Sequence, residues 1–289
     1  MSICLLVSGQ LGFTVLKFLF GKHSISSVFT DKNSAEIIAY CEVKKIPLFI
    51  GNPRGGKLAE FRSKIHCDIL LSVNYLFIID RDLIQYPSKY AINFHGSLLP
   101  KYRGRTPHVW AIINGEVKTG ITGHLITEEL DAGDIVFQKE IPILPEDTGY
   151  TILQKYFYEY PLIIETVLQS IENGSIKPYA QDHSKATFFP KRTPEDGKIN
   201  WDWNRERILN WIRALAPPYP GAFTFNLGTK LIIKQGVLSD ILFSDSDKNG
   251  KILNIQGNQI TIKTSNGALT IFLEDEDMIT QLKTGEILA

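Results

Sequence analysis

Asn93 and His95 stand two positions apart at the end of a short apolar run, just before a loop rich in Gly and Pro. Residues 91–94 predict a buried strand, and side chains two positions apart on a strand project from the same face. In open α/β sheets, ligands bind in the crevice outside the carboxyl ends of the strands. A lone histidine is more often structural, but a histidine placed there beside an amide donor is suited to act as a base. We therefore expect Asn93 and His95 to be catalytic.

An acidic side chain would complete this pair, because a carboxylate can orient an imidazole and stabilise its protonated form. Two candidates, Asp131 and Asp134, lie in a glycine-containing turn at residues 128–134. No packing requirement explains why this turn is so acidic. The residues alone leave the choice between them open.

Strand and helix patterns alternate through the first hundred positions. Short apolar runs predict strands at residues 3–7, 26–29, 47–50, 68–73 and 91–94. Helical spacing predicts helices at residues 11–20, 35–45 (opened by a cap signal at Asn33 and Ser34) and 57–64. Apolar strands joined by helices are typical of a parallel sheet covered on both faces. We expect an α/β, Rossmann-like domain with a mostly parallel sheet.

The pattern changes in the second half of the chain. The expected elements there are a helix at 107–113, strands at 119–127 and 135–143, and a long helix at 148–172 that is interrupted or kinked near Pro161. A polar, proline-bearing linker precedes a helix at 203–215, with Asn204 as its cap, and closely spaced strands at 222–225, 230–235, 251–256, 259–264 and 268–273. Such strands predict a small antiparallel, OB-like barrel or a sandwich. We expect a catalytic domain at 1–175, a linker at 176–198 and a β-rich domain at 199–289.

The composition narrows the classes of partner. Lys and Arg number 31 and Asp and Glu number 31, and this balance argues against a broad surface for nucleic acid or an anionic membrane. The three cysteines are far apart and lack metal-ligand spacing, which is typical of packed thiols in a reducing compartment. The sequence has no leader-like segment and no long apolar run, so we expect a cytoplasmic protein. Because it also has no metal-ligand cluster, we expect a protein without a metal.

The residues around His95 resemble a known family. The segment 93–104, Asn-Phe-His-Gly-Ser-Leu-Leu-Pro-Lys-Tyr-Arg-Gly, is similar to the signature of formyltransferases that use N10-formyltetrahydrofolate. Asp131 follows His95 by 36 positions (131 − 95), within Leu-Asp-Ala-Gly-Asp-Ile, and this separation matches the family. The segments 119–122, 189–197 and 216–223 are also similar. The resemblance covers most of the chain.

The resemblance implies Asn93, His95 and Asp131 as the catalytic residues. In acyl transfer, Asn93 would stabilise the oxyanion, His95 would take the amine proton, and Asp131 would orient His95. The resemblance also places the folate near the end of the fourth strand and near the Asp131 turn. The residues expected to bind the folate are Tyr75, Leu76, Phe77 and Asp134, for the first three of which core packing is the alternative.

Two branches of the family formylate different amines. The branch that acts on methionyl-tRNA carries a basic insertion after its second strand, whereas here residues 29–36 pass directly into a helix. Residues 197–289 contain ten Lys and Arg and ten Asp and Glu, so this region offers no net charge to phosphates. We therefore expect a nucleotide-linked amino-sugar as the acceptor, with methionyl-tRNA as the alternative. An inactive folate-binding module is a further alternative, against which the intact catalytic set argues.

The expected acceptor is a 3- or 4-amino-dideoxyhexose on dTDP, with UDP and GDP left open, and its products would feed bacterial surface polysaccharide. The pyrophosphate of a sugar nucleotide needs cationic side chains, and its nucleobase needs an aromatic ring on which to stack. Arg103 and Arg105 could each hold a phosphate or merely solvate their loop, and Gly104 favours Arg105. By analogy with relatives, the strand-rich C-terminal domain could supply the interface of a homodimer. The residues expected to bind the acceptor are Ser97, Arg105, Phe189, Lys191, Arg192 and Tyr219, with linker packing or a surface ion pair as the alternative for the last four.

Overall fold

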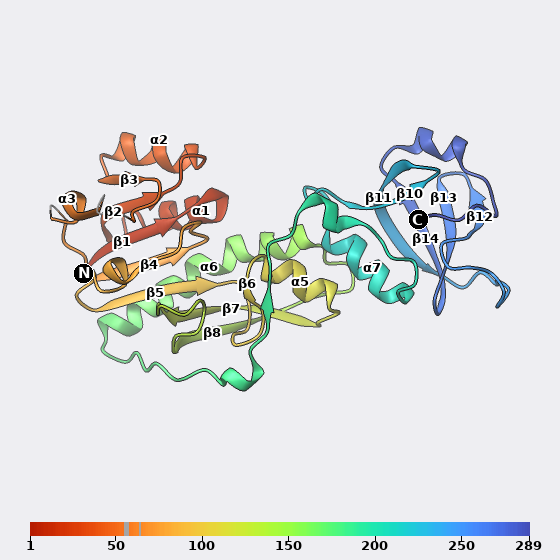
Figure 1. The fold of residues 1–289 in the computed structure, drawn as a ribbon. Coiled ribbons are helices and arrows are strands. Elements are labelled where there is room, and N and C mark those ends of the chain that lie inside the picture. Colours follow the sequence, from red (N-terminus) through yellow and green to blue (C-terminus); the bar gives the residue numbers. More distant parts are fainter. Residues whose placement is uncertain (55–57, 64) are drawn as a thin grey trace. The chain divides into compact units, whose positions relative to one another are not determined.

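The computed structural model describes residues 1–54, 58–63 and 65–289, which form two compact units (Figure 1). The first unit contains residues 1–104, 119–141 and 154–189. The second contains residues 105–118, 142–153 and 190–289. Because the units interleave along the chain, they do not test the sequence-based domain boundaries, which stay a prediction.

The first unit is built on a seven-stranded sheet with the order β3-β2-β1-β4-β5-β7-β8. The pairs β1·β2, β2·β3, β1·β4 and β4·β5 are parallel, and β5·β7 is antiparallel. The largely parallel α/β sheet predicted from the sequence is therefore confirmed. Its strands are β1 (Ser2–Val7), β2 (Ser24–Thr30), β3 (Leu48–Ile50), β4 (Ile69–Val73), β5 (Tyr90–His95), β7 (Lys118–Leu125) and β8 (Ile135–Pro142).

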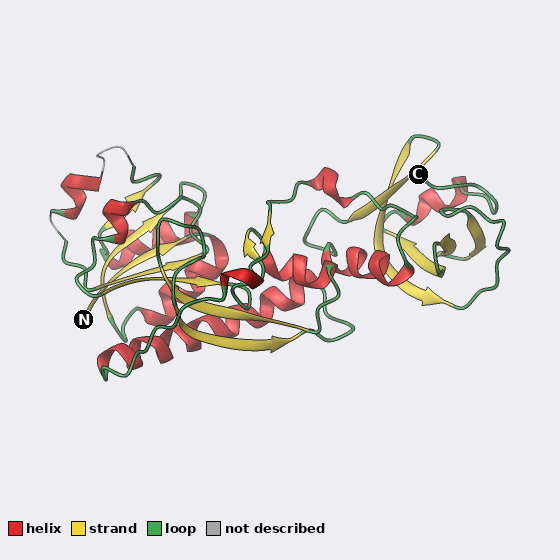
Figure 2. Cartoon of the chain, turned by 60° about the horizontal axis from the view of Figure 1, so that its bottom comes forward, coloured by secondary structure: helices red, strands yellow, loops and turns green. Residues whose placement is uncertain are grey.

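Helices lie between these strands or follow the last of them (Figure 2). They are α1 (Gly9–Leu19), α2 (Ala35–Lys44), α3 (Leu58–Arg62), α4 (Arg81–Ile84) and α6 (Gly149–Glu172), the last shared with the second unit. The central strands β1, β4 and β5 are mostly buried, and in β4 all five residues are buried. A strand covered on both faces has no polar side, so a continuous apolar run is what such a position requires.

Two expectations about helices differ from the structure, and a third is met in the described residues. The long helix α6 is not interrupted at Pro161, because the missing hydrogen bond of one proline is tolerated where the apolar side chains around it are buried. Ser34 does not cap α2 with its side chain, since its hydroxyl donates to Asp31 Oδ2 at 2.6 Å. The helix expected at 57–64 is observed as α3, and its two expected end residues, 57 and 64, lie outside the described residues.

The second unit contains helices α5 (Pro107–Ile113) and α7 (Arg205–Ala214), and a five-stranded antiparallel sheet with the order β10-β11-β14-β13-β12. As expected, Asn204 caps α7 by accepting from Arg207 N at 2.7 Å. Residues 285–289 hydrogen-bond to β10 through Phe225 and to β12 through Ile252, so the chain closes the sheet at both edges. Its strands are β10 (Ala222–Asn226), β11 (Thr229–Ser239), β12 (Ile252–Gln256), β13 (Gln259–Thr264) and β14 (Gly267–Leu273).

Two two-residue strands, β6 (Arg103–Gly104) and β9 (Phe188–Phe189), form a small parallel ribbon in the first unit. Sequence analysis did not predict this ribbon, nor α4, because both are too short for periodicity to reveal. Among the described helices, none is long and apolar enough to span a membrane.

The carboxylate of Asp68 joins the starts of two sheet strands, and it generates a prediction about pH. It accepts from Ser2 N at 2.8 Å and from Ser88 Oγ at 2.9 Å. These hydrogen bonds hold the pKa of Asp68 well below its usual range. A lowered folded-state pKa stabilises the fold above the unfolded pKa, and this stabilisation is lost as the pH falls through the folded pKa.

Asp68→Asn should lower the melting temperature at pH 7 by about 2–4 °C. The difference from the parent protein should shrink as the pH falls below about 4, because the unfolded parent then binds a proton that the folded carboxylate does not. Asp245→Asn, at an exposed position, is the control and should melt with the parent at every pH. A difference that is constant between pH 7 and pH 2 would contradict this role.

Candidate active site

The pairing of β5 with β7 brings Asn93 beside a second histidine. Asn93 lies opposite His124 in the register, and His95 lies opposite Thr122. The Asn93 Nδ2 atom is 3.1 Å from His124 Nε2. Both histidines are buried, with 8% and 3% of their surface exposed for His95 and His124. The two strands therefore direct an amide and two imidazoles to one place.

The turn after β7 brings Asp131 to the same place. Its Oδ1 atom is 3.7 Å from His95 Nδ1 and 3.6 Å from His124 Nε2. Its Oδ2 atom accepts from Gly104 N at 3.0 Å. Asp134 is exposed, and its backbone carbonyl pairs with Leu125 N, so of the two acidic candidates it is Asp131 that faces His95.

The sequence predicted that Asp131 orients the ring of His95, but in the structure a backbone carbonyl fixes this ring. His95 Nε2 lies 2.8 Å from the oxygen of Tyr102. Because a carbonyl can only accept, Nε2 carries the proton and the lone pair of neutral His95 is at Nδ1, towards Asp131. Tyr102 has a φ of 62°, a left-handed conformation that costs a non-glycine residue about 1–2 kcal/mol. Its ring stacks on Phe189 at 4.9 Å, and this contact helps to hold the strained backbone in place.

The environment keeps Asp131 ionised. Burial by itself raises the pKa of Asp131, but the charge that His95 can carry, the contact with His124 and the N–H of Gly104 outweigh it and hold the pKa well below its usual range. Asp131 is therefore a fixed negative charge facing Nδ1 of His95. A proton that arrives at Nδ1 meets a carboxylate that needs no reorganisation.

A buried network holds the backbone of the Asp131 turn. Gln181 Nε2 donates to the carbonyls of Asp131 and Gly133, at 2.9 and 2.7 Å. Arg103 Nη2 donates to Gln181 Oε1 at 2.8 Å and so fixes which end of the amide faces the turn. Arg103 is 1% exposed, so the alternative in which it merely solvates its loop is wrong. The network keeps Asp131 in its left-handed backbone conformation, with φ at 54°.

Two glycines allow the backbone approaches on which the site depends. A Cβ at Gly104 would lie 2.3 Å from the Phe189 carbonyl oxygen, and a Cβ at Gly133 would lie 1.9 Å from the Leu125 oxygen. Gly104 also has a φ of 101°. The sequence linked Gly104 to the approach of a ligand, whereas in this structure Gly104 lies close to the Phe189 carbonyl within the β6·β9 ribbon.

The residues expected to bind folate lie in the loop after β4. Tyr75 and Phe77 pack edge to face at 5.5 Å, and Leu76 is 45% exposed. Tyr75 packs against the core cluster around Phe29, and its buried hydroxyl has no hydrogen-bond partner among the described residues. The ring of Tyr75 thus packs in the core, which was the alternative to folate binding, while its hydroxyl keeps an unsatisfied hydrogen-bonding capacity.

The residues expected to bind the acceptor fall in both units. In the first unit, the hydroxyl of Ser97 donates to Lys101 O at 2.7 Å, and Phe189 stacks on Tyr102. The other four lie in the second unit, and of these Arg105 and Lys191 are exposed.

The remaining two have partners within the second unit. The guanidinium of Arg192 lies over the rings of Trp110 and Trp211, at 4.9 and 4.3 Å, and Tyr219 Oη is 2.8 Å from His108 Nε2. Burial lowers the pKa of His108 to about 4, so His108 is neutral near pH 7.

Sequence reasoning missed three participants: His124, Gln181 and the carbonyl of Tyr102. His124 had a usable signal, because it lies two positions after Thr122 in a predicted strand and so shares its face. Gln181 lies 50 positions from Asp131 in a segment expected to be linker, and its role depends on tertiary contacts.

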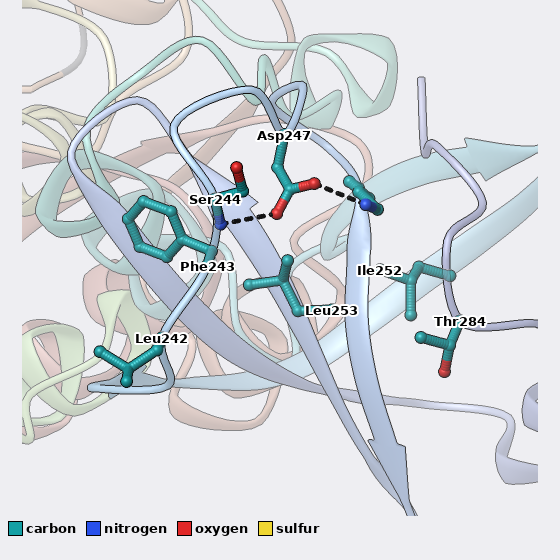
Figure 3. A pocket seen from close by; sticks show the side chains of 8 residues that line it. Leu242, Phe243, Ser244, Asp247, Ile252, Leu253 and Thr284 are labelled. Carbon is teal, nitrogen blue, oxygen red and sulfur yellow. Dashed lines mark hydrogen bonds and ion pairs between the residues drawn. The ribbon is translucent and has the colours of Figure 1, made fainter.

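A pocket of about 400 Å³ lies elsewhere, in the β-rich second unit (Figure 3). Its lining includes Leu242, Phe243 and an Asp247 carboxylate that accepts from Ser244 N and pairs with Lys251. Asp247, Ser244 and Lys251 are thus engaged with one another, and the pocket contains none of the residues predicted to be catalytic.

Comparisons with known proteins were made with the sequence and with the fold. Residues 21–167 match the formyl transferase family, and residues 191–276 match the formyl transferase C-terminal domain. The bifunctional polymyxin resistance protein ArnA of Wigglesworthia glossinidia brevipalpis is 36% identical over 252 residues, which cover 85% of this chain. The chain spans 37% of the length of that relative.

Three solved structures illustrate the shared fold. WlaRD, a sugar 3N-formyl transferase solved with dTDP and 5-N-formyl-THF, aligns with a TM-score of 0.75 at 20% identity, over 95% of this chain and 98% of its own. The N-formyltransferase from Helicobacter canadensis, in complex with folinic acid and dTDP-3-aminofucose, gives 0.75 at 20% identity, over 94% and 98%. Methionyl-tRNA formyltransferase from Clostridium thermocellum gives 0.58 at 21% identity, over 83% and 94%.

The network around the Asp131 turn predicts the effect of removing Gln181. Gln181→Leu would leave two buried carbonyls and one Arg103 N–H unpaired, and it should lower the free energy of unfolding by about 1–3 kcal/mol. Chemical denaturation of the purified protein measures this change. Gln169→Leu is the matched control, since Gln169 is exposed on α6 and its side-chain amide donates to Glu165 Oε1 at 3.3 Å. Equal stability of the two variants would remove the structural role of Gln181.

Proposed function

The chain belongs to the formyl transferase family, and on that premise we propose that it transfers a formyl group from N10-formyltetrahydrofolate to the amino group of a nucleotide-linked amino-dideoxysugar. The observation that carries this proposal is the buried cluster in which Asn93, His95 and Asp131 meet. The cluster joins an amide donor, a base and a fixed negative charge. These are the groups that acyl transfer to an amine requires.

His95 acts as the base in this proposal. The neutral amine of the acceptor forms a bond to the formyl carbon, and its surplus proton moves to Nδ1 of His95. Asp131, 3.7 Å from Nδ1, stabilises the imidazolium that results. When the bond from the formyl carbon to N10 breaks, N10 gains a proton, so His95 can return to its neutral state. The transfer is balanced: the acceptor loses one hydrogen and tetrahydrofolate gains one.

Asn93 acts on the formyl oxygen. As the amine attacks, negative charge develops on that oxygen, and an N–H of the Asn93 amide can donate to it. One N–H of Asn93 faces His124, which leaves the other for this purpose. Preorganised donors of this kind are worth about a hundredfold or more in rate.

Two features support a sugar nucleotide over methionyl-tRNA as acceptor. The link from β2 to α2 is only residues 31–34, and the buried carboxylate of Asp31 tightens it by accepting from Asn33 N and Ser34 Oγ. A basic insertion has no place there. In addition, two structures that share the fold over nearly the whole chain are of enzymes crystallised with dTDP or dTDP-3-aminofucose. We propose dTDP as the carrier, a cytoplasmic setting, and products that enter surface polysaccharide.

The loop after β4 fits the folate. Tyr75 carries a buried hydroxyl without a partner among the described residues, and an unsatisfied buried donor is costly. The amide and carbonyl groups of a pterin could supply the hydrogen bond that this hydroxyl lacks in the free protein. Leu76 offers apolar surface beside it. We assign this loop to folate binding, with Asp134 as a further candidate.

The substrate assignment is tested with a panel of acceptors. The protein is mixed with N10-formyltetrahydrofolate and with dTDP-, UDP- or GDP-linked amino-sugars or charged initiator tRNA, and release of tetrahydrofolate is followed. We expect turnover with a dTDP-amino-sugar. Turnover with the tRNA alone would overturn the choice of acceptor, and release of tetrahydrofolate without any acceptor would point to hydrolysis.

The base assignment predicts the behaviour of His95→Asn. This variant should lower kcat by at least a hundredfold, because the amide that replaces the imidazole cannot take up the proton of the acceptor amine. Binding of folate, measured by calorimetry, should change by less than about threefold, since His95 acts on the amine. A near-normal kcat would remove His95 from this role.

The folate assignment predicts an opposite pair of effects for Tyr75→Phe. The KM for the folate should rise about tenfold, because one hydrogen bond to the ligand is lost. The melting temperature of the ligand-free protein should stay the same or rise, because the variant removes an unsatisfied buried group. Tyr86→Phe is a control from the same core cluster, since its hydroxyl donates to Ile65 O, and it should lower the melting temperature without changing the KM. An unchanged KM in Tyr75→Phe would contradict the assignment.

A further inference from the structure

His124 is a buried imidazole that touches the catalytic cluster and has no role in the steps above. It contacts Asn93 on one side and faces Asp131 on the other. We propose that His124 is a positioning residue: it holds a neutral form with its proton on Nδ1, and its Nε2 lone pair fixes the amide of Asn93 so that one N–H faces the formyl oxygen. The catalytic part of this inference rests on the proposed function.

The backbone decides where the proton of His124 lies. His124 Nδ1 is 2.9 Å from the carbonyl oxygen of Leu125, which can only accept, so Nδ1 must donate. That carbonyl is itself held in place, because it packs directly against Gly133, where a Cβ would come within 1.9 Å of it. In neutral His124 the other ring nitrogen, Nε2, is therefore unprotonated.

The lone pair at Nε2 decides how the amide of Asn93 is turned. Asn93 Nδ2 donates to it at 3.1 Å, whereas an amide turned by 180° would set its oxygen against the lone pair. The amide thus has one defined orientation, with Nδ2 at His124 and its second N–H uncommitted by this contact. Without this partner, the Asn93 amide would have two orientations, of which only one places its N–H groups as the reaction needs.

The same proton placement leaves Asp131 to His95. His124 Nε2 is 3.6 Å from Asp131 Oδ1, the oxygen that also faces His95 Nδ1 at 3.7 Å. An unprotonated Nε2 cannot donate to this oxygen, so it does not compete with the proton that His95 receives. His95 and His124 thus face the same carboxylate with different tautomers. His95, with its proton on Nε2, acts as the base, and His124, with its proton on Nδ1, positions Asn93.

The first test reads the proton directly and needs no substrate. Protein labelled with ¹⁵N-histidine is studied by NMR at pH 7.5, and the signal of His124 is assigned by its loss in His124→Gln. The expected result is an Nδ1–H tautomer for His124 and an Nε2–H tautomer for His95. An Nε2–H tautomer or an imidazolium at His124 would overturn the proposal, whatever the protein is found to catalyse.

The second test uses two variants that differ in which ring nitrogen they replace. His124→Gln places an amide oxygen near Nε2 and can still accept from Asn93, whereas His124→Asn reaches only the position of Nδ1. His124→Asn should lower kcat about tenfold or more, with the KM for folate changed by less than about twofold. His124→Gln should recover most of that loss. Equal losses in the two variants, at similar melting temperatures, would contradict a role through Nε2.

A double-mutant cycle separates positioning from general stability. If His124 acts through Asn93, His124→Asn should change kcat by less than about twofold when Asn93→Ala is already present. The same tenfold loss in both backgrounds would overturn the proposal. Absence of formyl transfer by the parent protein would instead refute the proposed function, and the NMR result would still decide where the proton of His124 lies.

Discussion

The buried charge of Asp131 is the constraint on which the rest of the site depends. An ionised carboxylate with 7% of its surface exposed is costly unless hydrogen bonds and opposite charges compensate it. Gly104 supplies an N–H, His95 supplies a charge when it is protonated, and Gln181 holds the backbone that presents the carboxylate. The β6·β9 ribbon brings Gly104 to the carboxylate. The Asp131 turn, the β6·β9 ribbon and the buried Arg103 thus form one arrangement, which holds the negative charge of Asp131 next to His95.

Orientation and charge stabilisation are divided between two groups. The carbonyl of Tyr102 holds the ring of His95 through Nε2, at the cost of a left-handed backbone. Asp131 faces Nδ1, where the proton arrives, and so it is free to act on the charge alone. A site arranged this way loses little energy to reorganisation when the proton moves, which is how preorganised polar groups accelerate a reaction.

Much of this could be predicted from the sequence, for reasons that particular residues make clear. The fold followed from apolar runs such as 3–7, because a strand buried on both faces has no side that favours polar residues. Asn93 and His95 could be proposed because they share a face at a strand end, and the family resemblance selected Asp131 over Asp134. Gln181 and the Tyr102 carbonyl could not be found this way, since their roles arise from contacts with residues far along the chain or from the backbone, and neither leaves a periodic pattern.

The most direct test of this account follows the formyl group itself. N10-formyltetrahydrofolate carrying ¹³C in the formyl group is mixed with excess protein and a dTDP-amino-sugar, and the appearance of the ¹³C formamide is timed in a single turnover. We expect the formamide to form with the parent protein and its rate to fall at least a hundredfold in Asp131→Asn, which keeps the shape of the side chain and removes its charge. Formamide formation at the parent rate in Asp131→Asn would show that the buried charge is not what the site depends on.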